Sequence, residues 1–368
     1  MSAIYLLIVF IPAMLWVLVS KLVFKATITI KEWCMQVGAL ILVSALFWGF
    51  IAAGSLTASY DTEILNGYIT GKERARVSCE HQYKCGETCT RDAKGNQSCV
   101  PIYCDEHAYD VDWDVHSSVG GWTIHRVDRQ GLREPPRWSQ VVIGEPASRE
   151  ASARNYMLLQ EGHFHTSDAI MEKYKDSIPK YPGTYDYYRY NRVINETKTD
   201  YGWINTYLND QLRLMGKEKQ LNVIVVITNK TYDYYTAIRQ AWQGTKRNDV
   251  QLYFGLDPDG NIAWFKADSF ADGQSNSAML ESLRIPTLNA KITPELINEQ
   301  LLIIKQKFVR LPNEKLEYLK DQWSPSILFI SILTILNLLV AIGLSIVLHR
   351  QDLGEFEFLK KNKQRSYY

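Results

Sequence analysis

The sequence predicts a mixed α/β protein with three membrane-spanning helices, and three observations lead to this prediction. Three uncharged apolar stretches, Ala3–Val19, Val37–Gly54 and Ile327–Leu348, approach or exceed the length that a helix needs to cross a bilayer. A polar block of about 270 residues, long enough for one or two domains, separates the second stretch from the third. Inside this block the continuous apolar run Leu221–Thr228 precedes a helical and then a strand pattern, which is typical of a βαβ unit.

Charges beside the apolar stretches indicate how the chain is oriented. The short connection between the first two stretches holds Lys21, Lys25 and Lys31 against the single acid Glu32, and the C-terminal segment 350–368 is also basic. Basic short loops stay on the cytoplasmic side of a membrane. We therefore expect an N-terminus outside, an exoplasmic polar block and a cytoplasmic tail. In a Gram-negative host the polar block would be periplasmic.

This interpretation divides the chain into five parts. We expect a transmembrane hairpin at 1–56 with spans of about 3–20 and 36–54, a Cys-rich and β-hairpin module at 57–146, an α/β domain at 147–312, a stalk helix with the third span at 313–349, and a basic tail at 350–368.

Within the Cys-rich module, residues 55–77 suggest a polar lead-out from the second span. The segment Tyr109–Val115 alternates between apolar and acidic residues, which predicts a half-buried strand with its acidic face in solvent. The acidic face holds Asp110, Asp112 and Asp114. After a Gly-Gly turn we expect a returning strand at Trp122–Val127 and a third at Arg137–Ile143.

In the α/β domain the period of the apolar residues changes to that of helices. We expect helices at Ala147–Gln160, Asp200–Met215, Tyr232–Gln243 and Pro294–Arg310, strands at Leu221–Thr228, Asp249–Gly255 and Ile262–Ala267, and a stalk helix at Asn313–Trp323.

Five of the six cysteines fall within 26 residues, with His81 and His107 close by in the sequence. They are Cys79, Cys85, Cys89, Cys99 and Cys104. In an oxidising compartment two disulfides would use four of them and leave one free or paired between chains. The alternative is a zinc site made by Cys85, Cys89, Cys99 and Cys104. The predicted compartment favours disulfides.

Four acids surround the hairpin that follows the βαβ unit, near the place where α/β proteins put their sites. They are Asp257, Asp259, Asp268 and Asp272, which could hold a divalent cation. The motif around Asp257 resembles part of a calcium loop, but it lacks the downstream Glu, which favours a plain turn. None of the nucleophile-elbow, zinc-protease, P-loop or dinucleotide motifs occurs in the sequence. The formal charge of +1 argues against a nucleic-acid partner.

The stretch LNVIVVIT, the helix ending in AWQGTKRNDV, and the strand QLYFG with its hairpin resemble the TPM-domain family over residues 221–270. That resemblance implies a membrane-tethered α/β sandwich facing the periplasm, the lumen or the outside. Some members of the family are described as phosphatases. The loop Gln243–Arg247 departs from the more glycine-rich loop of the family. The polar block, including HAYDVDWDVHSSVG, also resembles uncharacterised membrane proteins of tailed bacteriophages.

These features together predict a membrane-anchored exoplasmic scaffold or interaction protein. Its expected partners are the lipid bilayer and envelope proteins, and the resemblance implies a phage-encoded protein acting at the host envelope. The alternative is a TPM-like metal-dependent phosphohydrolase that uses the four acids with a divalent cation.

Overall fold

The structure is a computed structural model that describes residues 4–23, 28–91, 95, 97–160, 162, 164–270, 276–288 and 290–350. The predicted basic tail beyond residue 350 lies outside the described residues. The chain divides into two compact units. The first holds the described residues of 1–60, 154–163 and 313–350, and the second those of 61–153 and 164–312.

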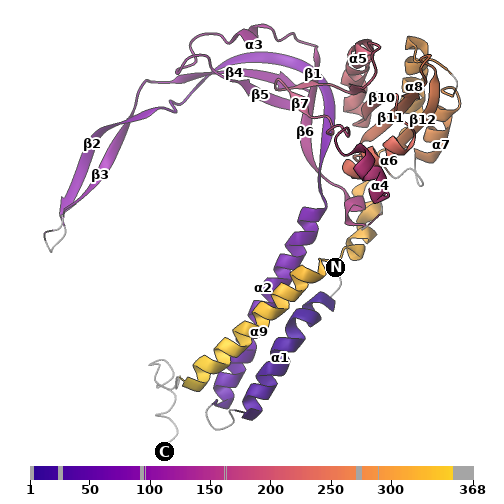
Figure 1. Cartoon of the computed structure of the whole chain (residues 1–368). Coiled ribbons are helices and arrows are strands. Elements are labelled where there is room, and N and C mark those ends of the chain that lie inside the picture. Colours follow the sequence, from indigo (N-terminus) through magenta and orange to yellow (C-terminus); the bar gives the residue numbers. More distant parts are fainter. Residues whose placement is uncertain are drawn as a thin grey trace, which may run out of the picture. The chain divides into compact units, whose positions relative to one another are not determined.

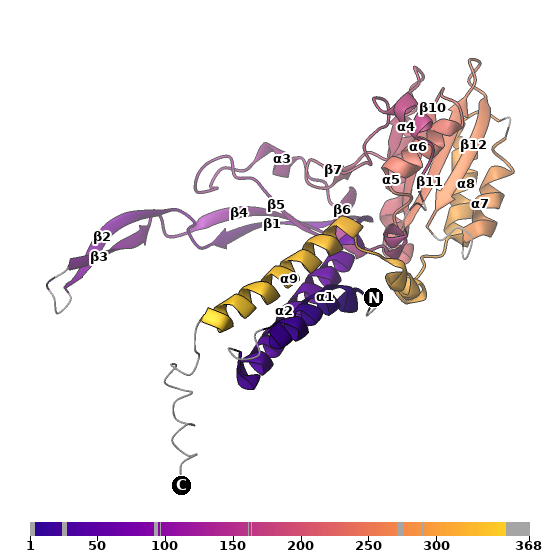
Figure 2. The same ribbon diagram turned by 60° about the horizontal axis from the view of Figure 1, so that its bottom comes forward.

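Three apolar helices form most of the first unit: α1 (Ile4–Val23), α2 (Ile30–Ala58) and α9 (Ile327–Arg350). They pack side by side (Figures 1 and 2). Each is long and apolar enough to cross a membrane, as the sequence predicts. Most of their large apolar side chains face outward, which fits a lipid surrounding.

Side-chain hydrogen bonds join these helices to one another. Asn337 of α9 donates hydrogen bonds of 2.9 Å to the carbonyl of Val9 and to the Ser44 hydroxyl. Nearer the other end, the Gln36 amide donates to the Ser345 hydroxyl at 2.7 Å. Since small and polar side chains hold membrane helices together, these contacts set the packing of the three helices.

The remaining elements of the first unit are two 3-10 helices, η1 (Tyr156–Leu159) and η3 (Asn313–Gln322), which contact each other. The α-helical stalk expected at Asn313–Trp323 is therefore a 3-10 helix. Lys320 lies over the Tyr156 ring at 5.0 Å, so this segment is fixed by side-chain contacts with η1.

The second unit begins with a four-stranded sheet in the order β5-β4-β1-β6. Its strands are β1 (Tyr60–Val77), β4 (Asp110–Ser117), β5 (Gly120–Ile124) and β6 (Pro146–Arg154). Strand β4 lies antiparallel to both β1 and β5. Val111, Trp113 and Val115 of β4 are buried on one face, which confirms the alternating strand.

Three expectations for this region are wrong. The lead-out at 55–77 is mostly the long strand β1. The strand expected at Arg137–Ile143 is the one-turn helix α3 (Pro136–Ser139), since Pro136 suits the first helical position. The helix expected at Ala147–Gln160 is β6 followed by η1, because pairing with β1 overrides the helix propensity of an alanine-rich segment.

Between β1 and β4 the chain forms a two-stranded antiparallel ribbon of β2 (Gln82–Arg91) and β3 (Gln97–Asp105), which we call the arm. Both views show it continuing away from the four-stranded sheet (Figures 1 and 2). All residues of its two strands are exposed except Gly86 and Cys104, which are half-buried. Burial therefore contributes little to its stability.

The second sheet has the order β12-β11-β10-β9. Strands β9 (Val193–Asn195), β10 (Asn222–Thr228) and β11 (Asp249–Leu256) run parallel, and β12 (Ile262–Ser269) is antiparallel to β11. The expected βαβ unit and hairpin are therefore present. Every residue of β10 and β11 is buried.

Helices cover both faces of this sheet, as Figure 1 shows. On one face lie α5 (Gly202–Lys219), α7 (Ser277–Arg284) and α8 (Pro294–Lys307), and on the other α4 (Asp168–Tyr174) and α6 (Asp233–Ala241). Val223, Val225 and Ile227 pack toward the first group, and Ile224 and Val226 toward the second. A strand buried on both faces explains the unbroken apolar run in the sequence.

A buried arginine connects the two sheets. The Arg192 side chain is 1% exposed. Its guanidinium donates to the side chains of Asn209 on α5, Asn222 on β10, and Asn66 and Ser148 on β1 and β6. Asn222 in turn donates to Asp249 at 2.9 Å. Burial lowers the pKa of Arg192 to about 10, so the side chain keeps its charge at neutral pH.

Candidate functional site

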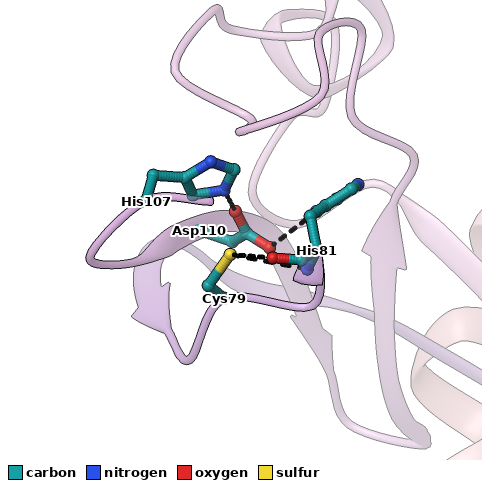
Figure 3. A group of neighbouring side chains, drawn as sticks. All are labelled: Cys79, His81, His107 and Asp110. Atoms are coloured by element: carbon teal, nitrogen blue, oxygen red, sulfur yellow. Dashed lines mark hydrogen bonds and ion pairs between the residues drawn. The ribbon is translucent and has the colours of Figure 1, made fainter. Parts of the chain in front are cut away.

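Four side chains with metal-binding atoms meet at the base of the arm. Cys79 and His81 precede β2, His107 follows β3, and Asp110 is the first residue of β4. Their sulfur, nitrogen and oxygen ligand atoms all lie within 4.8 Å of one another. Figure 3 shows the Asp110 carboxylate between the other three side chains. The pairing of β2 with β3 therefore brings the residues that precede the arm close to those that follow it.

The contacts inside this cluster leave the Nδ1 atom of His81 without a hydrogen bond. His107 Nε2 contacts Asp110 Oδ1, and the Cys79 thiol donates to the His81 carbonyl at 3.1 Å. His81 Nδ1 lies 3.4 Å from Asp110 Oδ2. That nitrogen is buried and has no hydrogen-bond partner among the residues that the structure describes. Such an atom is a natural candidate for a metal ligand.

Asp110 is the fully buried member of the cluster, although the alternation of its strand predicts that it faces solvent. Its Oδ2 accepts hydrogen bonds from the Glu80 backbone N–H at 2.9 Å and from Arg126 Nη1 at 3.0 Å. Desolvation acts to raise the pKa of this carboxyl. The Glu80 N–H, the His107 ring and the Arg126 guanidinium outweigh it and lower the pKa to about 2. Asp110 is therefore an anion at neutral pH.

The five clustered cysteines separate into two disulfides and one thiol. Cys85 is bonded to Cys104 and Cys89 to Cys99, so the disulfide prediction is confirmed for four of them. These four have no thiolate to offer a metal, which is inconsistent with the zinc alternative at those positions. Cys79 is the free thiol that the odd number of cysteines predicts.

The sequence carries part of the signal for this cluster. The spacing C-x-H before the arm and H-x2-D after it places two ligand pairs at the ends of one hairpin. His81 and His107 stand out beside the cysteines, but Asp110 is hidden in an alternating strand. The two ligand pairs meet only because β2 pairs with β3, and that pairing is not visible in the local sequence.

The acids around the β11–β12 hairpin do not converge. Asp257 accepts from the backbone N–H of Asp259 and of Asn261 at 2.9 and 2.8 Å, so it stabilises the turn. Asp268 lies opposite Gln251 at the far end of β12, where it accepts from Tyr235 at 2.8 Å. Asp272 lies outside the described residues. Because Asp257 and Asp268 are at opposite ends of the hairpin, they cannot bind one metal ion together.

The loop Gln243–Arg247 is occupied by contacts with β1. Lys246 pairs with Asp61, and Arg247 pairs with Glu63 at 2.7 Å. Both acids are almost fully buried. This loop therefore attaches the α/β sheet to β1, which accounts for its charged sequence.

No protein-family model, curated protein or solved structure matches this chain. Its function is therefore inferred from its own residues and their geometry.

Proposed function

We propose that this protein crosses a membrane three times and acts as a scaffold through an exoplasmic second unit. The three apolar helices α1, α2 and α9 support membrane insertion. The second unit lies in the chain between α2 and α9. If both helices cross the membrane, the whole second unit is on one side of it. Two disulfides favour the oxidising side for the second unit. Lys21 in the last turn of α1 and Lys31 in the first turn of α2 favour the cytoplasm for the opposite side.

The exposed arm is the observation that carries the scaffold proposal. Tyr83, Val100, Ile102 and Tyr103 are all exposed on this ribbon, which forms a sheet of only two strands. Exposed apolar and aromatic side chains that lie close together are typical of a protein-binding surface. Both outer edges of the ribbon can also accept a further strand. We propose that the occupant is an extended apolar segment of another envelope protein.

The resemblance of the polar block to membrane proteins of tailed bacteriophages supports a host envelope as the place of action. The TPM-like stretch at 221–270 supports an α/β domain held close to a membrane. In this proposal the α/β domain is the rigid base and the arm is the contact element.

Site-specific photocrosslinking in the native membrane tests the binding surface. A photoreactive residue at Tyr103 should give an adduct with a defined envelope protein, while one at the equally exposed Leu214 on α5 should not. Replacing both Val100 and Ile102 by Ser should reduce the Tyr103 adduct at least about fivefold, as expected for losing contacts worth more than about 1 kcal/mol. Identical adducts from both positions, or no adduct from Tyr103, would contradict the proposal.

The orientation has a separate test in a background with Cys34 and Cys79 replaced by Ser. Thr197 lies in the second unit. A membrane-impermeant maleimide should therefore label Thr197→Cys in cells whose outer envelope is permeabilised while the membrane that holds the protein stays intact. It should label Lys31→Cys only after the membrane is lysed. The reverse pattern would place the second unit in the cytoplasm.

The TPM-like phosphohydrolase remains an alternative prediction. The purified full chain would be assayed on an aryl phosphate with Mg²⁺ or Mn²⁺. Activity that Asp259→Asn abolishes would replace the scaffold proposal with an enzymatic one.

A further inference from the structure

We propose that Cys79, His81, His107 and Asp110 bind one Zn²⁺ ion that closes the base of the arm. This inference does not depend on the proposed scaffold function, since it rests only on the cluster itself. The site is distinct from the four disulfide-bonded cysteines.

The donor set selects the metal. One thiolate, two imidazoles and one carboxylate are four ligands of the kinds that zinc takes in closed tetrahedral sites. Mg²⁺ and Ca²⁺ prefer oxygen ligands throughout, so a sulfur and two nitrogens disfavour them. The thiolate and the carboxylate together offset the charge of a divalent ion.

The geometry needs only small side-chain movements to complete the site. Ligand atoms around a tetrahedral zinc lie roughly 3.3–3.8 Å apart, from bond lengths of about 2.0–2.3 Å. The four ligand atoms already lie within 4.8 Å of one another. The rings of His81 and His107 are 5.7 Å apart between centroids, so both border the same space.

Asp110 is held as a metal-binding carboxylate usually is. Its Oδ2 accepts from the Glu80 N–H and from Arg126, while its Oδ1 faces His107 Nε2. Partners on the outer oxygen fix the orientation of a ligating carboxylate. The charge of Arg126 is balanced by Asp112 at 2.6 Å and by Glu80 at 3.2 Å. The guanidinium therefore orients Asp110 without opposing a cation on the other oxygen.

The position of the cluster suggests what the ion would do. Its ligands come in two pairs, one before β2 and one after β3. A metal ion that joins both pairs closes the loop formed by the arm and fixes its base to β4. The two disulfides cross-link the ribbon itself, and the zinc ion would fix the ribbon to the sheet.

Metal binding can be measured on the purified full chain in detergent. The protein is stripped with a chelator, and ZnCl₂ is titrated in competition with a chromophoric chelator. We expect one Zn²⁺ per chain with a Kd below about 0.1 µM. Cobalt in place of zinc should give a thiolate-to-cobalt charge-transfer band and the visible bands of a tetrahedral ion.

Variants identify the ligands. Cys79→Ser and His107→Ala should each weaken zinc binding at least about 100-fold, and Cys79→Ser should abolish the charge-transfer band. His116→Ala is the matched control, because His116 is an exposed histidine on β4 that pairs with Glu73 at 3.3 Å outside the cluster. Intact disulfides by mass spectrometry and an unchanged unfolding midpoint without zinc show that each variant folds.

Hydrogen exchange adds a readout at the proposed place. Zinc should slow amide exchange in segments 79–82 and 105–110 of the wild-type chain but not of Cys79→Ser. Equal zinc affinity in the wild type and Cys79→Ser would overturn the proposal. So would alkylation of Cys79 at the same rate with and without zinc, or a disulfide between the Cys79 residues of two chains in zinc-containing medium.

Discussion

Two pairs of neighbouring strands in the second unit differ completely in burial. Every residue of β10 and β11 is buried between two layers of helices. In β2 and β3 all residues but two are exposed, and two disulfides cross-link the strands. The first pair is stabilised by the apolar area that it removes from water. An isolated two-stranded hairpin is marginal in water, so the second pair depends on covalent restraint.

The contrast shows how one unit can carry a rigid base and a free surface. A strand whose side chains are all buried cannot contact another protein through them. The arm keeps both faces accessible because its cross-links replace the missing core. We therefore expect substitutions in the base to change the free energy of unfolding, and substitutions in the arm to change local order or binding.

We expect the largest loss in the free energy of unfolding from a substitution of the buried Arg192. Arg192→Met removes the guanidinium that donates to the amide oxygens of Asn66, Asn209 and Asn222, and it removes a buried positive charge near Asp249. Breaking a buried charge network in this way costs about 3–5 kcal/mol. Urea unfolding of the full chain in detergent, followed by tryptophan fluorescence, measures the loss.

Arg189→Met is the control for this experiment. The Arg189 side chain is 46% exposed and pairs only weakly with Asp186, at 3.3 Å. Its removal should change the free energy of unfolding by no more than about 0.5 kcal/mol. Equal losses from the two variants would mean that Arg192 does not connect the sheets in the way described.

Removing a disulfide should be the next largest effect, and it should be confined to the arm. In Cys89→Ser/Cys99→Ser the ribbon loses a cross-link worth about 3 kcal/mol in the chain-entropy model. Hydrogen exchange should become fast in β2 and β3 while β10 and β11 keep their protection. A parallel loss of protection in β10 would show that the arm and the base fold as one cooperative element.

Low pH should have a smaller effect on the free energy of unfolding, through Asp233 at the start of α6. Hydrogen bonds from Lys173, Thr231 and Tyr174 lower the pKa of Asp233 from 3.8 to about 2. A lowered folded-state pKa gives stability that is present above about pH 4 and is lost as the pH falls toward 2. Because Lys173 is 53% exposed, the contribution should stay below about 1 kcal/mol.

The dependence on pH distinguishes this pair from a general acid effect. Asp233→Asn and Lys173→Met should each flatten the fall in unfolding free energy between pH 4 and 2, and the double variant should add little to either. Additive losses would show that the two side chains act independently.

The sequence predicts the base far better than the arm, for a physical reason. The run Leu221–Thr228 is so apolar that only a strand buried on both faces explains it. Strand β1 carries Asp61 and Glu63, whose partners Lys246 and Arg247 follow more than 180 residues later. Its local composition therefore suggests a loop. The helix propensity of β6 is likewise overridden by a pairing that only the folded chain supplies.

The candidate metal centre shows the same limit. The cysteines stand out by their density, and the compartment that the sequence predicts favours two disulfides over a four-cysteine site, which agrees with the disulfides of the structure. Which cysteine stays free, and which acid joins it, depends on the register of β2 against β3. The alternation of apolar and acidic residues around Asp110 predicts that this side chain is exposed. In the structure, residues before and after the arm cover it.

The smallest expected effect on stability concerns the exposed face of the arm and most directly tests what the contrast means. Val100 and Ile102 are 62% and 45% exposed, so replacing both by Ser should change the free energy of unfolding by about 0.5 kcal/mol or less. The same change should remove the proposed partner contact, because these side chains would be buried only in the complex. Urea unfolding and crosslinking from Tyr103 measure the two effects in one preparation. A large loss of stability would instead show that this face packs against the rest of the protein, and the arm would then be a structural element and not a binding surface.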